Sequence, residues 1–261
     1  MKRFLLTSCT GIALALGGCA TAGTPDADTA AVSTPAAPSG PALWKVADED
    51  TTIYLFGTVH VLPADVEWYD EDIAAALENA DTLVTEIPAD AMKDPALQAA
   101  IMQKAMLPEG QTLRQMLSAE DRAVYEQALG KLGMPPAAFD RFEPWFAGMT
   151  LSVLPLIKKG YDPESGVEKI VEAAASKTAQ RAAFETVGQQ IDFFDTLPME
   201  SQTEFLMALA RDLDGMVTMM DEMVAEWLEG DADGLAEIMN KSMTDPVVAA
   251  ALLYNRNERW A

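Results

Sequence analysis

Two short apolar segments with one amphipathic helix between them constrain the fold of this chain more than any other feature. Residues 53–56, Ile-Tyr-Leu-Phe, and residues 81–86, Asp-Thr-Leu-Val-Thr-Glu, have the composition of buried strands. Residues 70–80 place apolar side chains at helical spacing, and Asp70 stands where it can cap the first turn. A strand, a helix and a second strand form a β-α-β unit with parallel strands. The sequence therefore predicts an α/β protein.

A hairpin, a further strand and many helices are expected around this unit. Residues 43–47 and 51–56 flank the turn-like Asp48-Glu49-Asp50, which predicts the hairpin, and residues 183–185 resemble a short strand. The remaining periodicity is helical in residues 91–159 and 167–176, after Pro198, near Leu235 and from Pro246. The predicted fold has a central mixed sheet, an N-terminal hairpin and a large α-helical insertion, and is helix-rich overall.

Residues 1–19 have the features of a lipoprotein signal peptide. Lys2 and Arg3 precede an apolar stretch that ends in Leu-Gly-Gly-Cys19, which resembles the bacterial lipobox. Signal peptidase is expected to cut before Cys19, whose thiol then carries the lipid. An ordinary signal peptide or a short anchor helix is the alternative, but the stretch is far shorter than the ~20 residues that span a bilayer. Because Ala20 follows the cysteine, we expect an outer-membrane location that faces the periplasm.

Residues 20–41 are rich in Ala, Thr, Ser, Pro and Gly, which is typical of a flexible tether. The tether would hold a domain of residues 42–261 away from the membrane. The chain has 41 acidic and 18 basic residues, and its net charge of −23 disfavours nucleic acid as a partner. Its two cysteines are Cys9 and Cys19, so cysteine chemistry is excluded from the domain.

Two polar residues follow the ends of the predicted strands. His60, the only histidine, comes shortly after Gly57, and Glu86 ends the second apolar segment. Parallel strands would bring both side chains to one edge of the sheet, where a neutral imidazole and a carboxylate could bind a divalent metal ion or exchange protons. The alternatives are structural: a histidine bonded into the core or a turn, and a glutamate in a salt bridge or a helix cap.

Common catalytic motifs are absent from the sequence: there is no G-x-S-x-G, Walker loop, H-E-x-x-H or G-x-G-x-x-G. The segments Tyr-Leu-Phe-Gly-Thr-Val-His60, Leu-Val-Thr-Glu86-Ile, Gly-Val-Glu168, Phe-Glu-Thr186 with Gln189-Gln190, and Tyr-Asn-Arg256-Asn257 instead resemble the TraB/GumN family of bacterial proteins. That family is similar to the Tiki metalloproteases and to heme-binding and erythromycin-esterase-like proteins. The resemblance implies an α/β core and metal-dependent hydrolysis with peptides as substrates.

The resemblance also implies roles for individual residues. Gly57 and His60 match a first G-x-x-H, in which His60 would bind the metal ion. Glu86 would be a second ligand or the base that activates water, while Arg256 would hold a substrate carboxylate or an oxyanion with Asn257 as a neutral donor. Glu185, also near a strand end, is a further candidate for the site, with a structural hydrogen bond as its alternative role.

The family's second G-x-x-H is not found, because the chain has a single histidine. We expect a domain that is incomplete at its C-terminus, the alternative being a member that has lost its site. The predicted function is a lipid-anchored hydrolase that uses manganese, cobalt or zinc and acts on a peptide or protein. The alternative is a non-catalytic envelope lipoprotein that captures a peptide, heme or polymer.

Overall fold

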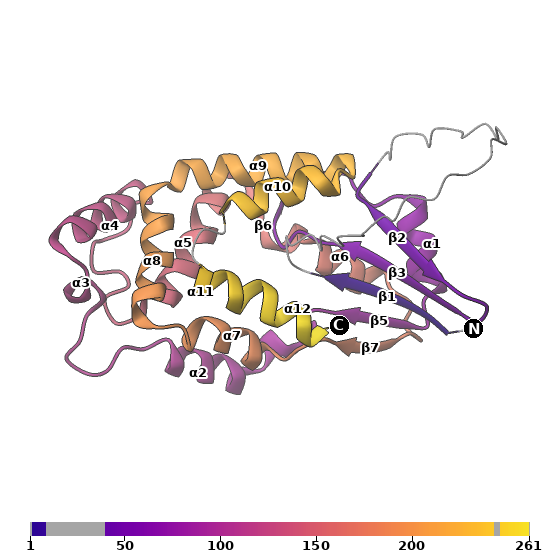
Figure 1. Cartoon of the computed structure of the whole chain (residues 1–261), viewed down its shortest axis with the longest axis horizontal. Coiled ribbons are helices and arrows are strands. Elements are labelled where there is room, and N and C mark those ends of the chain that lie inside the picture. Colours follow the sequence, from indigo (N-terminus) through magenta and orange to yellow (C-terminus); the bar gives the residue numbers. More distant parts are fainter. Residues whose placement is uncertain (1, 9–39, 243–245, 261) are drawn as a thin grey trace, which may run out of the picture.

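A five-stranded sheet at one end of the molecule and layers of helices at the other make up the fold (Figure 1). The computed structural model describes residues 2–8, 40–242 and 246–260, so that Cys19 and nearly all of the predicted tether lie outside the described residues. The strand order is β2-β3-β1-β5-β7. The predicted helix-rich α/β fold is confirmed.

The predicted hairpin is present as β2 (Leu43–Ala47) and β3 (Thr51–Gly57), which pair antiparallel. Its turn is held by the side chain of Asp48, whose Oδ1 accepts hydrogen bonds from the backbone N–H of Thr51 at 2.7 Å and of Asp50 at 3.2 Å. This local bonding explains why the short acidic segment reverses the chain between the two strands.

The β-α-β unit is also present, with α1 (Glu71–Asn79) leading from β3 to β5 (Thr82–Thr85). Asp70 caps α1 as predicted, because its carboxylate accepts a hydrogen bond from Ile73 N at 2.8 Å. Both β3 and β5 run parallel to β1 (Lys2–Ser8), which lies between them. The carboxyl ends of β3 and β5 therefore meet at the same edge of the sheet.

The position of β1 bears on the predicted signal peptide. The backbone of residues 2–8 pairs with β3 from Lys2 opposite Thr51 to Ser8 opposite Gly57. Cleavage before Cys19 would remove this strand, so the sheet of a processed chain would differ from this one at its centre.

Beyond β5 the strands are few and short. β7 covers Gln180–Ala183 and pairs parallel with β5, so that the strand predicted at residues 183–185 begins and ends earlier than the sequence indicates. Glu185 consequently lies past the end of β7, in the turn before the next helix. A separate two-stranded sheet is formed by β4 (Leu62–Pro63) and β6 (Tyr161–Asp162).

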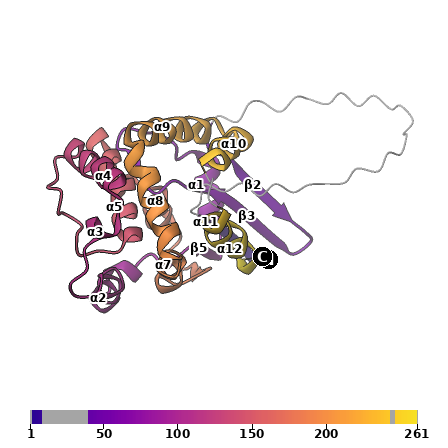
Figure 2. The same cartoon turned by 60° about the vertical axis from the view of Figure 1, so that its left-hand side comes forward.

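The helical part surrounds two further apolar cores, while α1, α6 and α9 cover one face of the sheet. Both views show α8 between α3 and α4 on one side and α11 and α12 on the other (Figures 1 and 2). The remaining helical elements are η1 (Ala91–Lys93), α2 (Pro95–Lys104), α3 (Leu113–Met116), α4 (Ala119–Lys131), α5 (Pro144–Lys159), η2 (Pro163–Ser165), α6 (Val167–Ala174), α7 (Val187–Asp195), α8 (Met199–Arg211), α9 (Leu213–Glu229), α10 (Ala232–Ser242), α11 (Pro246–Ala249), η3 (Ala250–Tyr254) and α12 (Asn255–Trp260).

Helices α5 and α8 pack closely at Gly148. A Cβ at this position would lie 2.7 Å and 2.8 Å from two ring carbons of Phe205, and 3.4 Å from the Cα of Leu206. The absence of a side chain at Gly148 therefore allows the two helices to approach closely.

We predict that Gly148→Ala lowers the free energy of unfolding by about 1–3 kcal/mol, because overpacking outweighs the gain in helix propensity of about 1 kcal/mol. The matched control is Gly130→Ala in α4, where no atom lies within 4 Å of the new Cβ. That variant should gain stability. Urea denaturation measures both, and a gain in both variants would show that α5 and α8 do not pack as described.

Candidate active site

Two glutamates are brought together where β5 and β7 end. Glu86 directly follows β5, and the backbone N–H of Glu185 donates to the carbonyl of Glu86 at 3.1 Å. Parallel pairing places Thr85 opposite Ala183, which fixes the register of the segments that follow. Glu86 is 3% exposed and Glu185 is 8% exposed, so both carboxylates are buried.

A single guanidinium binds both carboxylates. Nη2 of Arg256, in α12, forms ion pairs with Glu86 and Glu185, and its Nε donates to Oε1 of Glu185 at 2.9 Å. Arg256 is 5% exposed, and its guanidinium carbon lies 4.5 Å from the centroid of the Trp260 ring and 5.6 Å from that of the Phe193 ring. The structure thus brings together Glu86, Glu185 and Arg256, which the sequence singled out, although Glu86 and Arg256 are about 170 residues apart in the chain.

Gln190 also contacts the two glutamates, although the sequence alone gave it no role. Its Nε2 donates to Oε1 of Glu86 and, at 3.3 Å, to Oε1 of Glu185. The capping box between Thr186 and Gln189 begins α7 and so sets the direction in which Gln190 points. The sequence motif of the capping box can be recognised without a structure, but the contact of Gln190 with Glu86 depends on the register of the sheet. We call Glu86, Glu185, Arg256 and Gln190 the buried cluster.

The buried cluster is electrostatically incomplete. It holds two carboxylates against one guanidinium, and Oε2 of Glu86 is buried with no hydrogen-bond partner among the described residues. Burial raises the pKa of Glu185, while the hydrogen bond from Gln190 opposes that shift. A buried acceptor oxygen without a partner is costly, so the arrangement favours uptake of a proton or a cation.

His60 lies in a second group of contacts, which we call the histidine loop (residues 57–60). The carbonyl of Gly57 accepts from the indole N–H of Trp227 at 2.9 Å, and the carbonyl of Val59 accepts from Val167 N at 3.0 Å. A Cβ on Gly166 would lie 2.2 Å from the carbonyl oxygen of His60. The start of α6 therefore packs directly against this loop, and only glycine permits the contact.

Glu168 orients the imidazole of His60. Nδ1 of His60 lies 3.3 Å from Oε1 of Glu168, which also accepts a hydrogen bond from the hydroxyl of Thr58. The His60 side chain is 63% exposed. A carboxylate on Nδ1 favours the tautomer in which Nε2 carries the lone pair, as in many metal-binding histidines. The sequence offered Glu168 only as part of a matching motif.

The other candidate residues have weaker structural support. Asn257 is half-buried, and its side chain makes no hydrogen bond within the described part of the chain. Gly57 ends β3 and has open space at its Cβ position. Within residues 2–8, 40–242 and 246–260, no group of three or more His, Cys, Asp and Glu side chains has the geometry of a metal site.

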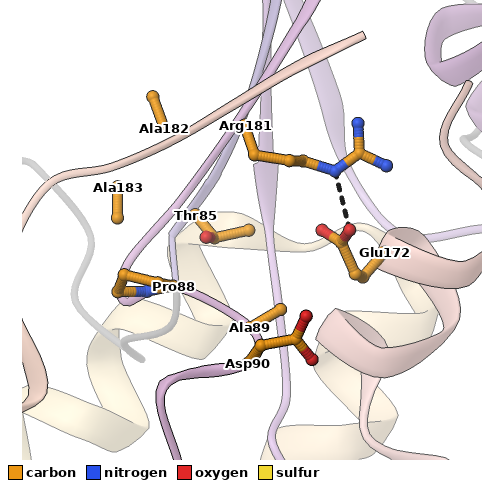
Figure 3. Close-up of a pocket in the computed structure, with 8 residues that line it drawn as sticks. All are labelled: Thr85, Pro88, Ala89, Asp90, Glu172, Arg181, Ala182 and Ala183. Carbon is orange, nitrogen blue, oxygen red and sulfur yellow. Dashed lines mark hydrogen bonds and ion pairs between the residues drawn. The ribbon is translucent and has the colours of Figure 1, made fainter. Parts of the chain in front are cut away.

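A cavity of about 270 Å³ lies beside β5 and β7 (Figure 3). It is lined by Thr85, residues 88–90, Glu172 and residues 181–183. Nε of Arg181 donates to Glu172 at 2.7 Å, as the dashed line in Figure 3 shows. Because this ion pair already satisfies the guanidinium, the cavity contains no open cationic group.

We predict that Arg256→Met lowers the free energy of unfolding by about 3–5 kcal/mol near neutral pH, because it leaves buried carboxylates without a counter-charge. Buried carboxyl groups favour their protonated form, so the loss should shrink as the pH falls from 8 to 5. Urea denaturation at several pH values measures this. Arg122→Met, at an exposed arginine, should change little at any pH, and a small or pH-independent loss for Arg256→Met would contradict the buried cluster.

A second prediction concerns the tautomer of His60, which can be assigned by NMR without ambiguity because the chain has one histidine. In alkaline buffer, where imidazole side chains are neutral, long-range ¹H–¹⁵N spectra should show mainly the Nδ1–H form. Glu168→Ala should raise the Nε2–H form, whereas Glu172→Ala, one turn later in α6, should not. An unchanged tautomer ratio in Glu168→Ala would refute the orienting contact.

The model of the TraB/PrgY/gumN family matches residues 42–261. Comparison with curated proteins and with solved structures gave no significant match. The family match covers all of the chain after the predicted tether and contains both the buried cluster and the histidine loop. The chain therefore belongs to the TraB/PrgY/gumN family.

Proposed function

We propose that the protein is a divalent-metal-dependent hydrolase of peptide bonds, held in the bacterial cell envelope by a lipid on Cys19. The observation that carries this proposal is the buried cluster, in which Glu86 and Glu185 share the guanidinium of Arg256. Such a group of buried charges lowers stability relative to apolar packing, and proteins keep costly polar groups mainly where they serve function.

The donor set agrees with the metal that family membership suggests. Oε2 of Glu86 is a buried oxygen with no hydrogen-bond partner among the described residues, and the exposed side chain of His60 carries a second imidazole nitrogen, Nε2, besides the Nδ1 that contacts Glu168. Nitrogen and carboxylate oxygen are ligands that manganese, cobalt and zinc accept. In this proposal His60 and Glu86 would hold the ion, which when bound would polarise a carbonyl group and activate water.

In this proposal the neighbours of Glu86 and His60 hold these two side chains in position. Gln190 and Arg256 bind Oε1 of Glu86 and leave Oε2 without a hydrogen bond among the described residues, so in this proposal Oε2 is the atom that takes a proton from a bound water molecule. Glu168 holds His60 by Nδ1. Because the Arg256 guanidinium is engaged by two carboxylates, its role in this proposal is to position them, and Asn257 remains the candidate for a neutral donor to the substrate.

The envelope location rests on the predicted lipobox alone. The described residues contain no helix long and apolar enough to cross a membrane. In this proposal attachment comes from the lipid on Cys19, and the tether of residues 20–41 carries the domain on the periplasmic side of the outer membrane. The strong negative charge is consistent with a substrate other than nucleic acid.

One observation favours the alternative of a non-catalytic binding lipoprotein. Arg256 neutralises much of the charge of Glu86 and Glu185, as a structural ion pair would. In that case the sheet edge would capture a peptide, heme or polymer without turnover.

We predict that the full chain cleaves members of a peptide library when manganese, cobalt or zinc is added, and that chelation stops the cleavage. His60→Ala and Glu86→Gln should each lower the rate by at least about 100-fold, since each removes a ligand or a proton acceptor. Product formation by mass spectrometry measures this.

Glu172→Gln is the matched control, because its carboxylate belongs to α6 and pairs with Arg181 outside the buried cluster. It should retain full activity. Absence of metal-stimulated cleavage, or cleavage that persists in both site variants, would rule out the hydrolase and leave the binding function.

A further inference from the structure

A pocket between α7 and the C-terminal helices contains chemistry that the proposed mechanism does not use. It has a volume of about 390 Å³ and borders the buried cluster through Phe193. We call it the α7–α12 pocket, and its lining residues are Gln189, Asp192, Phe193, Thr196, Ala251, Asn255 and Arg259.

Arg259 is held in a defined position in this pocket. Its guanidinium carbon lies 4.7 Å from the centroid of the Phe193 ring, and its Nε donates to the carbonyl of Asn255 at 3.2 Å. The cation–π contact and this hydrogen bond together hold the guanidinium over the ring. The two terminal nitrogens have no hydrogen bond or ion pair with any residue that the structure describes.

This open guanidinium is unusual in the molecule. The other arginines with described side chains are bonded to carboxylates or, for Arg141, to backbone carbonyls. The chain has 41 acidic residues against 18 basic ones, so carboxylate partners are abundant. A guanidinium that has no hydrogen-bonded carboxylate in such a chain, and that lines a pocket, has the chemistry to bind an external anion.

The rest of the pocket fits a carboxylate attached to a peptide. Asp192 would repel an anion, but its carboxylate is bound by Nζ of Lys104 at 2.7 Å. Oε1 of Gln189 already accepts hydrogen bonds from Thr186 in the capping box. The amide of Asn255 and Nε2 of Gln189 can bond to a peptide unit, and Ala251 and Phe193 supply apolar walls.

Phe193 contacts the guanidinium groups of both Arg259 and Arg256. An anion on Arg259 would therefore lie near two cations, and also near the carboxylate of Glu185, whose pKa is raised by burial and lowered in part by the charge of Arg259.

We propose that the α7–α12 pocket binds the C-terminal carboxylate of a peptide, with Arg259 as the anion-binding residue. The inference rests on the proposed function, because it makes peptides with a free C-terminus the substrate class of that hydrolase. Two parallel N–H···O bonds from the guanidinium would hold the carboxylate, and the peptide would extend past Phe193 toward Glu86 and Glu185.

Equilibrium binding of acetyl-trialanine to the full chain tests the proposal, with chelator present so that no hydrolysis occurs. The free acid should bind, and the C-terminal amide should bind at least about tenfold more weakly, because it cannot accept two charge-assisted hydrogen bonds. Arg259→Gln should weaken binding of the free acid by a similar factor. Arg122→Gln, which changes an exposed arginine of α4, should bind the free acid as tightly as the unmodified chain does.

Several results would overturn the proposal. They are equal binding of acid and amide by the unmodified chain, undiminished binding by Arg259→Gln, and tighter binding of inorganic phosphate than of the peptide acid. The comparison of acid with amide needs no variant, so it does not depend on the folding of Arg259→Gln. Because binding is measured without turnover, failure of hydrolysis would refute the proposed function while leaving this result intact.

Discussion

The ion pairs of Arg256 with Glu86 and Glu185 are the interaction on which the candidate site depends. They connect α12 to the ends of β5 and β7, and they do so in a buried environment where one guanidinium serves two carboxylates. In such an environment an unpaired charge is far more costly than a paired one is favourable. The position of α12, and with it that of the α7–α12 pocket, is therefore coupled to the ionisation of two glutamates.

Local features of the fold could be predicted from the sequence, because their causes are local. The acidic turn of the hairpin, the cap at Asp70 and the helix-rich composition all follow from residues within one or two turns of each other. The end of β7 was misplaced, since the short segment at residues 180–185 has no strong alternation and its pairing with β5 decides its limits. β1 was not predicted as a strand, because its composition is that of a signal peptide.

The site was only partly predictable for a related reason. The apolar segment before Glu86 was enough to place this residue at a strand end. Arg256 was predicted as a site residue only from the family resemblance, because the spacing of the sequence does not link positions so far apart. Gln190 and Glu168 received no role because hydrogen bonds between elements depend on register and helix orientation. Arg259 was not singled out, since an open guanidinium is visible only when the partners of the other arginines are known.

In the proposed function the buried cluster serves chemistry rather than stability. The most direct measurement is the free energy of unfolding of Glu86→Gln together with its manganese affinity. Since this change leaves one carboxylate for one guanidinium, we expect stability to stay equal or rise while manganese binding is lost. A loss of stability of about 3 kcal/mol or more with unchanged manganese binding would contradict the account and make the buried cluster a structural ion pair.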